Sequence, residues 1–133
     1  MLHIQKKIKK KKYPDSPSGM PGVQTILPIM LNHVHNKKLS LGQLIKLMCE
    51  NPCKIFGIQN KGYIKEDFDA DLTIVDMNKE RTIKDEMMAS KCGWTPFNNF
   101  SIKGFPVATI INGKIVMSDG KVIIEGSGQP LDF

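Results

Sequence analysis

The chain has 133 residues, of which 41% are hydrophobic and 24% are charged. A length near 130 fits one compact domain and is about half of the ~250 residues that a complete (β/α)8 barrel needs, so these residues alone do not make a whole barrel enzyme. Residues 1–12 hold six lysines and no acidic residue, and the remaining chain has thirteen basic and thirteen acidic residues. The net charge of +6 is therefore a property of the amino-terminal tail, and the body of the chain is neutral.

The three cysteines, Cys49, Cys53 and Cys92, have spacings that match no zinc or redox signature. This pattern predicts reduced thiols in a cytoplasmic protein. No run of residues approaches the ~18 apolar residues of a membrane span, and the amino terminus has charge without the apolar stretch of a secretory signal. We therefore expect a soluble protein with no membrane partner.

The first 22 residues are predicted to form a basic tail that leads into a loop. The lysine run repels itself and disfavours compact structure. The residues that follow it are rich in proline and glycine, which interrupt helices and strands. These are Pro14, Pro17, Gly19, Pro21 and Gly22.

Residues 23–60 are predicted to be helical. Between Val23 and Val34, apolar residues recur three and four positions apart, which places them on one face of a helix. Pro28 lacks an amide hydrogen, so this helix is expected to start near Pro28 or to bend there.

A second helix is predicted from residue 41 to about residue 50, with Ser40 as its N-cap. Asn51-Pro52 is expected to end this helix, and Pro52 is expected to open a further short turn that Gly57 closes. The apolar residues of the second helix are expected to form a buried stripe. They are Leu41, Leu44, Ile45 and Met48.

Residues 61–133 are predicted to be mainly β-structure. A first strand over residues 72–75 is expected to end at Asp76, and a short helix is expected at residues 85–90. Two dipeptides, Asn112-Gly113 and Asp119-Gly120, suit two-residue hairpin turns that need positive φ. They separate three further predicted strands, at residues 107–111, 114–117 and 121–124, and the whole pattern predicts a β meander.

Several motifs occur together in a characteristic order. They are S-P-S-G-M-P-G-V-Q-T-I-L-P at residues 16–28, L-S-L-G-Q-L at 39–44, N-P at 51–52, I-F-G at 55–57, G-Y-I at 62–64, D-A-D-L-T-I-V-D at 69–76, W-T-P-F at 94–97 and K-G at 103–104. Taken together, they resemble the carboxyl-terminal third of dihydroorotase, a cyclic amidohydrolase of the amidohydrolase superfamily. The resemblance covers about residues 13–125, and the proline-rich loop and the W-T-P-F motif are its most specific parts.

The resemblance implies an α+β fragment of a metal-dependent hydrolase fold. The helices would be the last helices of a (β/α)8 TIM barrel, and the strands would form the meander of a composite β-sandwich that also contains strands from before the barrel. It divides the chain into a basic tail with a substrate-loop-like segment (1–22), the helical end of the barrel (23–60) and a β-sandwich-like part (61–133).

Enzymes of this family hydrolyse the cyclic amide of dihydroorotate reversibly to carbamoyl aspartate, a step of pyrimidine biosynthesis. They use zinc to polarise the carbonyl and to activate water. Their metal ligands and their general base, the aspartate of a D-H-A-P-H motif, belong to stretches without a counterpart in these residues. The resemblance therefore implies zinc in the intact family, no cofactor and no catalytic residue in this chain alone, and leaves open whether the chain is an enzyme.

Pro21 and Gly22 match the family loop whose backbone carbonyl and amide meet the edge of the dihydropyrimidine ring. A loop kept only for its shape is the alternative. His3 lies at the distance from the same loop at which the family has a histidine that helps to bind the substrate carboxylate. The residues around His3 depart from the family pattern, so a solvated tail residue is the competing interpretation.

Other candidate residues are assigned to structure. His33 and His35 imitate an H-x-H metal pair, but residues two apart on a helix point about 200° apart and cannot share one ion. Trp94 and Phe97 are expected to pack where the barrel and the sandwich meet. Asp69 and Asp71 flank a strand start and are interpreted as solvated loop carboxylates.

Three functions remain open. The chain is a dihydroorotase-like piece that is inactive alone, or a subunit of a split amidohydrolase completed by a complementary amino-terminal barrel chain, or a non-catalytic interaction module with a basic tail. The tail has no arginine and one aromatic residue at its border, which argues against a nucleic-acid partner. In a complete barrel, strands and neighbouring helices cover the last helices. Without them, we also expect self-association through the apolar faces of these helices.

Overall fold

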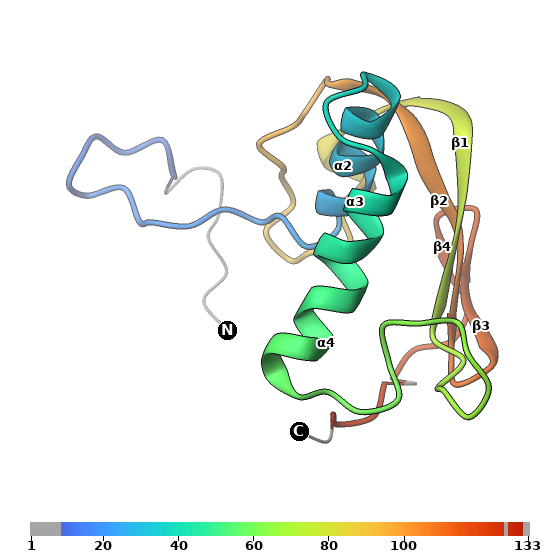
Figure 1. Cartoon of the computed structure of the whole chain (residues 1–133). Helices are drawn as coiled ribbons and strands as arrows, with labels where there is room; N and C mark the ends of the chain where they lie inside the picture. Colours follow the sequence, from blue (N-terminus) through green and yellow to red (C-terminus); the bar gives the residue numbers. More distant parts are fainter. Residues whose placement is uncertain (1–8, 127, 132–133) are drawn as a thin grey trace.

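A computed structural model describes residues 9–126 and 128–131 of the chain. A layer of helices lies on one side of an antiparallel sheet, and no other described segment covers the opposite side of that sheet (Figure 1). This arrangement confirms the predicted α+β architecture. Within the described ranges, no helix is long and apolar enough to span a membrane.

Helix α2 runs over Ile26–His35 and follows a turn that includes the predicted residues 23–25. The helix starts two residues before Pro28, so the missing amide hydrogen falls in the first turn, where it breaks no intrahelical bond. Pro28, Leu31 and Asn32 are the buried residues of this helix. The apolar face that the sequence predicts therefore exists, although the helix is shorter at its start.

The second helical segment begins at the predicted cap. The Ser40 hydroxyl accepts a hydrogen bond from the Gln43 N–H (3.2 Å), and the Gln43 side chain accepts one from the Ser40 N–H (2.7 Å), which is a complete capping box. Helix α3 spans Leu41–Ile45, a π-helical turn η1 spans Lys46–Glu50, and helix α4 spans Asn51–Phe56. Gly57 ends the segment with φ of 67°, as its sequence position predicts.

The predicted end at Asn51-Pro52 is wrong, because the backbone stays helical through these residues. Pro52 cannot donate to the carbonyl four residues earlier, and its ring would clash with that carbonyl in a regular α-helix. The π-helical turn removes the conflict, since the Asn51 N–H bonds to the Lys46 carbonyl five residues back.

The predicted buried stripe of the second helix is mostly wrong. Leu44 is 3% exposed, but Leu41 and Ile45 are 43% and 44% exposed, and Met48 is half-buried. Outside its own helical segment, α3 makes its main contacts with α2, and of the predicted stripe only Leu44 is buried.

The sheet is the predicted meander, with the order β1-β2-β3-β4 and antiparallel pairing throughout. Both predicted turns are present with positive φ at their two central residues, 49° and 75° at Asn112-Gly113 and 47° and 81° at Asp119-Gly120. The strands are β1 (Leu72–Thr82), β2 (Ser101–Ile111), β3 (Lys114–Ser118) and β4 (Lys121–Val122), and a single 3-10 turn η2 (Asp85–Met87) lies between β1 and β2.

Several predicted strand boundaries and the predicted short helix need correction. Strand β1 does not end at Asp76, and β2 begins six residues before the predicted start, because the two strands pair again at residues 80–82 of β1 after a second register shift. Pro106 lies at the first register shift, where a strand tolerates a missing N–H. Strand β4 is two residues shorter than predicted, and the helix predicted at residues 85–90 is only the turn η2.

Helix α2 approaches β2 closely, and this contact joins the two layers. The side-chain oxygen of Asn32 accepts a hydrogen bond from the Lys103 N–H (3.1 Å). A Cβ at Gly104 would lie 2.9 Å from the Leu31 Cβ, and Gly104 has φ of 93°. The apolar side chains buried between and beside the layers are Leu31, Leu44, Ile83, Trp94, Ile102 and Val116.

Candidate functional site

The Pro21-Gly22 loop is fixed to the start of α2. The Gly22 carbonyl accepts hydrogen bonds from the Thr25 N–H (3.0 Å), the Ile26 N–H (2.9 Å) and the Thr25 hydroxyl (3.2 Å). Thr25 is only 2% exposed, so the turn rests on a buried side chain. The helix therefore determines the direction in which the chain leaves Gly22.

The peptide between Pro21 and Gly22 keeps its polar groups available. In the described part of the chain, neither the Pro21 carbonyl nor the Gly22 N–H takes part in a hydrogen bond. The carbonyl and the N–H of one trans peptide point in opposite directions. The edge of a ring-shaped ligand can therefore meet one of these two groups while the other group faces the opposite side of the loop.

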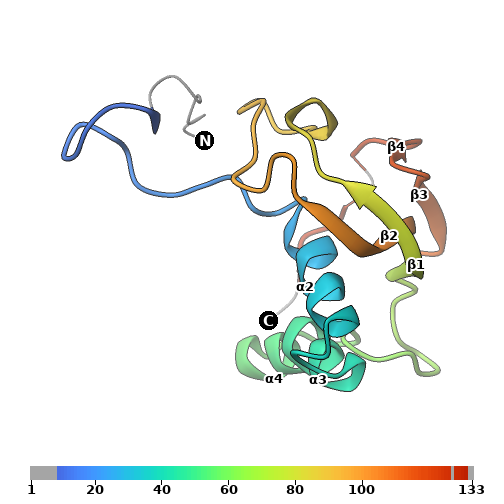
Figure 2. The ribbon, with the colours of Figure 1, turned by 90° about the horizontal axis from the view of Figure 1, so that it is seen from above.

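A second contact holds this loop from the side of the sheet. The Gln24 side-chain amide donates to the Met87 carbonyl (2.7 Å), and its oxygen accepts from the Ala89 N–H (2.9 Å). Seen from above, the loop before α2 meets the segment between β1 and β2 at this place (Figure 2). Two regions more than sixty residues apart in sequence are thereby joined.

The segment that receives Gln24 is itself well ordered by hydrogen bonds. The Asp85 carboxylate accepts from the Thr95 N–H (2.9 Å), and the Asp85 N–H donates to the Asn98 side chain (3.0 Å). Thr95 is 3% exposed and Trp94 is 7% exposed, so the first two residues of the W-T-P-F motif are part of the core. The core assignment is thus confirmed for Trp94, whereas Phe97 is only half-buried.

His33 and His35 form no metal-binding cluster with other described residues. His33 and His35 lie in the last turn of α2, one half-buried and one exposed, as the helical spacing predicts. The Nδ1 atom of His33 is buried without a hydrogen-bond partner. Among residues 9–126 and 128–131, no three His, Cys, Asp or Glu side chains are grouped so that they could hold a metal ion. His3 lies outside the described residues.

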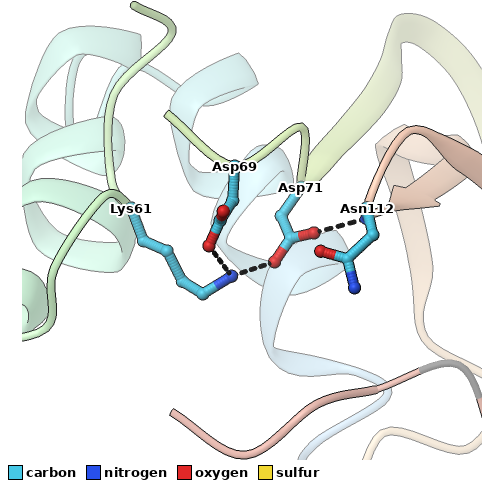
Figure 3. Close-up of polar contacts among 4 residues, drawn as sticks. All are labelled: Lys61, Asp69, Asp71 and Asn112. Atoms are coloured by element: carbon cyan, nitrogen blue, oxygen red, sulfur yellow. Dashed lines mark hydrogen bonds and ion pairs between the residues drawn. The ribbon is translucent and has the colours of Figure 1, made fainter. Parts of the chain in front are cut away.

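Asp69 and Asp71 are exposed loop residues, as the sequence predicts, and they are also paired with Lys61, which it does not indicate. The Lys61 ammonium contacts both carboxylates, with 2.8 Å to Asp69, and the second oxygen of Asp71 accepts a hydrogen bond from the Asn112 N–H at 2.8 Å (Figure 3). Asp71 therefore links the connection after α4 to the turn between β2 and β3. We call Lys61, Asp71 and Asn112 a clasp, because the paired charges and the hydrogen bond hold these segments together.

The pairing shifts the pKa values in the expected directions. The hydrogen bond from Lys61, and then the one from the Asn112 backbone, holds the pKa of Asp71 below its usual range. The hydrogen bonds to Asp69 and Asp71 raise the pKa of Lys61. The stabilisation from Asp71 is therefore present above the usual aspartate range and is lost as the pH falls through the lowered pKa.

Replacing Asp71 with asparagine is expected to lower the free energy of unfolding at neutral pH by less than about 1 kcal/mol, because the pair is partly exposed. Urea titrations from neutral to acidic pH measure this loss, and the difference between the variant and the wild type should shrink as the pH falls. Asp119→Asn is the control. Asp119 also pairs with Lys79, but its side chain is 74% exposed, so this substitution should change the free energy of unfolding less than Asp71→Asn does. A difference for Asp71→Asn that does not change with pH would contradict the assignment.

Sequence reasoning missed Gln24 and Lys61. Gln24 is part of the loop motif, but the sequence does not indicate its role, because its partners lie in a segment without a periodic pattern. Lys61 stands eight and ten residues before the two aspartates, at no helical or strand spacing. A glutamine inside a motif of otherwise apolar and small residues was the one available signal for the first of these.

Comparison with known proteins shows the class of the protein. Residues 20–116, which include the loop and most of the sheet, match the amidohydrolase family, and the chain belongs to that family. The resemblance to dihydroorotase is confirmed by curated relatives. A dihydroorotase of Methanothermobacter thermautotrophicus is 39% identical over 115 residues, which are 86% of this chain and 26% of that protein. A dihydroorotase of Pyrococcus furiosus is 41% identical over 112 residues, covering 84% and 27%.

Solved structures agree on the fold. An L-hydantoinase (dihydropyrimidinase) from Arthrobacter aurescens superposes with a TM-score of 0.83 at 37% identity, over 88% of this chain and 27% of that chain. A D-hydantoinase from a Thermus species has a TM-score of 0.82 at 24% identity, which shows the fold alone. The chain therefore spans about a quarter of the length of the relatives that it matches.

Proposed function

We propose that these residues supply the substrate loop and the β meander of a dihydroorotase-like enzyme. The enzyme would hydrolyse the cyclic amide of dihydroorotate reversibly to carbamoyl aspartate, for pyrimidine biosynthesis in the cytoplasm. The observation that carries the proposal is the similarity to dihydroorotases along more than four-fifths of the chain. Pro21 and Gly22 lie inside the family match, and within the described residues the peptide between them makes no hydrogen bond, which would suit contact with the edge of a substrate ring.

The described residues do not fit the metal site of such an enzyme, because they offer no group of three suitable ligands. In the intact family, zinc supplies carbonyl polarisation and an activated water. We assign the metal ligands and the general base to the polypeptide that forms the rest of the barrel. We assign no catalytic step to residues 9–126 and 128–131.

The surface of the helices supports this assignment. Ile45 and Leu47 are 44% and 55% exposed, and Ile55 and Phe56 at the end of α4 are 74% and 62% exposed. Ile45 and Leu47 are two positions apart and point in nearly opposite directions, so apolar side chains are exposed on more than one side of the segment. Such a segment is typical of a helix that other protein surfaces cover. We assign this cover to the remaining barrel, and without it we expect the purified chain to self-associate.

A chimera tests the proposal. The 133 residues replace the matched quarter of the Pyrococcus furiosus dihydroorotase, and ring opening of dihydroorotate is measured for the chimera and for the 133-residue chain alone. We expect chelator-sensitive turnover by the chimera and none by the chain alone. Turnover by the chain alone that stops with chelator would overturn the assignment of the metal site. A folded, zinc-loaded chimera without turnover would overturn the proposed function.

Gly22→Ala in the same chimera tests the loop. A Cβ at Gly22 would meet no atom within 4 Å, so the fold should be unchanged. If the adjacent peptide meets the substrate ring, the added methyl group raises the KM roughly tenfold, the effect of losing one good contact. An unchanged KM would remove Pro21 and Gly22 from the binding site.

A further inference from the structure

We propose that Gln24 is a positioning residue, which holds the Pro21-Gly22 peptide in the geometry that the substrate ring needs. This inference rests on the proposed function. Gln24 is not placed in contact with substrate; it acts through the loop two residues before it.

The side chain of Gln24 is fixed at both of its polar atoms. Its Nε2 donates to the Met87 carbonyl at 2.7 Å, and its Oε1 accepts from the Ala89 N–H at 2.9 Å. The two partners are two residues apart, so the side-chain amide pairs with them as a neighbouring strand would. One donor and one acceptor together also define which way the amide is turned.

Gln24 supports the loop on the side of the β1–β2 connection. Its two hydrogen bonds join the loop to Met87 and Ala89. The helix side is fixed separately, through the three hydrogen bonds to the Gly22 carbonyl. Losing the Gln24 contacts would free the loop on one side while α2 stays intact.

The receiving segment is a suitable support. Asp85, Thr95 and Asn98 hold it through two further hydrogen bonds, and Trp94 is buried beside Thr95. Gln24 itself is exposed, so its bonds contribute little to the stability of the fold. A small displacement of a binding group has a large effect on substrate binding. Loss of Gln24 should therefore change the KM much more than it changes stability.

Two substitutions whose side chains have about the length of glutamine distinguish positioning from simple packing. Gln24→Met removes both hydrogen bonds. Gln24→Glu keeps the acceptor for the Ala89 N–H, but its carboxylate faces the Met87 carbonyl, and only the protonated acid can donate to that carbonyl. In the chimera we expect Gln24→Met to raise the KM roughly tenfold at every pH, relative to the parent chimera, with little change in kcat. Gln24→Glu should raise it at neutral pH and recover in acid.

The control for the glutamine-to-methionine change is Gln59→Met. Gln59 is also exposed, and its Nε2 donates to the Gly57 carbonyl at the end of α4, away from the loop. The KM of the Gln59→Met chimera should equal that of the parent chimera. A KM for Gln24→Met within twofold of the control, or a Gln24→Glu variant that does not recover in acid, would overturn the positioning role.

A measurement without activity distinguishes this inference from the proposed function. Amide hydrogen exchange of the 133-residue chain should show a protected Ala89 N–H in the wild type and in Gln24→Glu, and an unprotected one in Gln24→Met. If the parent chimera is inactive but this pattern holds, the proposed function fails and the contact of Gln24 stands. If Ala89 exchanges equally in all three proteins, Gln24 does not hold the loop and the inference fails.

Discussion

Replacing Gly104 with alanine is expected to lower the free energy of unfolding by about 3 kcal/mol. The new Cβ would lie 2.9 Å from the Leu31 Cβ, and Gly104 has φ of 93°, a conformation that side chains rarely adopt. A Cβ has no rotamer with which to move away, so α2 and β2 must separate. That separation would also lengthen the hydrogen bond between Lys103 and Asn32.

Gly113→Ala is the matched control for this substitution. Gly113 also has a positive φ, 75°, but a Cβ there would meet no atom within 4 Å. Its cost is the backbone strain alone, about 1 kcal/mol. Urea unfolding followed by circular dichroism compares the two variants, and equal losses would show that the contact with Leu31 is not what requires glycine at position 104.

Replacing Trp94 with alanine is expected to cost about 4 kcal/mol, the usual effect of removing a large buried aromatic side chain. The side chain is 7% exposed and belongs to a small buried core within the described residues, so little else can compensate. Thermal unfolding should be followed by circular dichroism, because Trp94 is the only tryptophan and its fluorescence disappears in the variant.

The control for Trp94 is Tyr13→Ala, since Tyr13 is an aromatic residue that is 94% exposed. This variant should melt within about a degree of the wild type, because surface substitutions change stability little. A small loss for Trp94→Ala, similar to that for Tyr13→Ala, would contradict the assignment of Trp94 to the core.

Elements that depend on neighbouring residues could be predicted from the sequence. The cap at Ser40 and the turn at Asn112-Gly113 are local, because the residues that form each one are at most three positions apart. The helix end at Gly57 has the same character, since a glycine supplies the left-handed conformation by itself.

Elements that depend on distant partners could not be predicted in this way. Strand β1 continues to Thr82 because β2 pairs with it, and its polar second half has no pattern that indicates burial. The clasp of Lys61, Asp71 and Asn112 joins three separate segments. Such contacts arise only when the fold brings the segments together.

The candidate site shows the same division. The loop motif drew attention to Pro21 and Gly22 through resemblance, and their role remains a prediction. Gln24 stands in the same motif, but its partners Met87 and Ala89 contribute only backbone atoms. Backbone atoms leave no trace in a sequence, so only the structure could indicate the contact.

The π-helical turn η1 changes how the segment from Leu41 to Phe56 should be compared with other proteins. The hydrogen bond from Asn51 to Lys46 encloses one residue more than a regular α-helical turn. One residue corresponds to about 100° of rotation, so α4 is rotated by about that angle relative to its place in a regular α-helix with the same number of residues. A relative with a regular α-helix and one residue fewer here would present the same outer surface at the positions of Ile55 and Phe56, whereas a regular α-helix of equal residue number would present a rotated one.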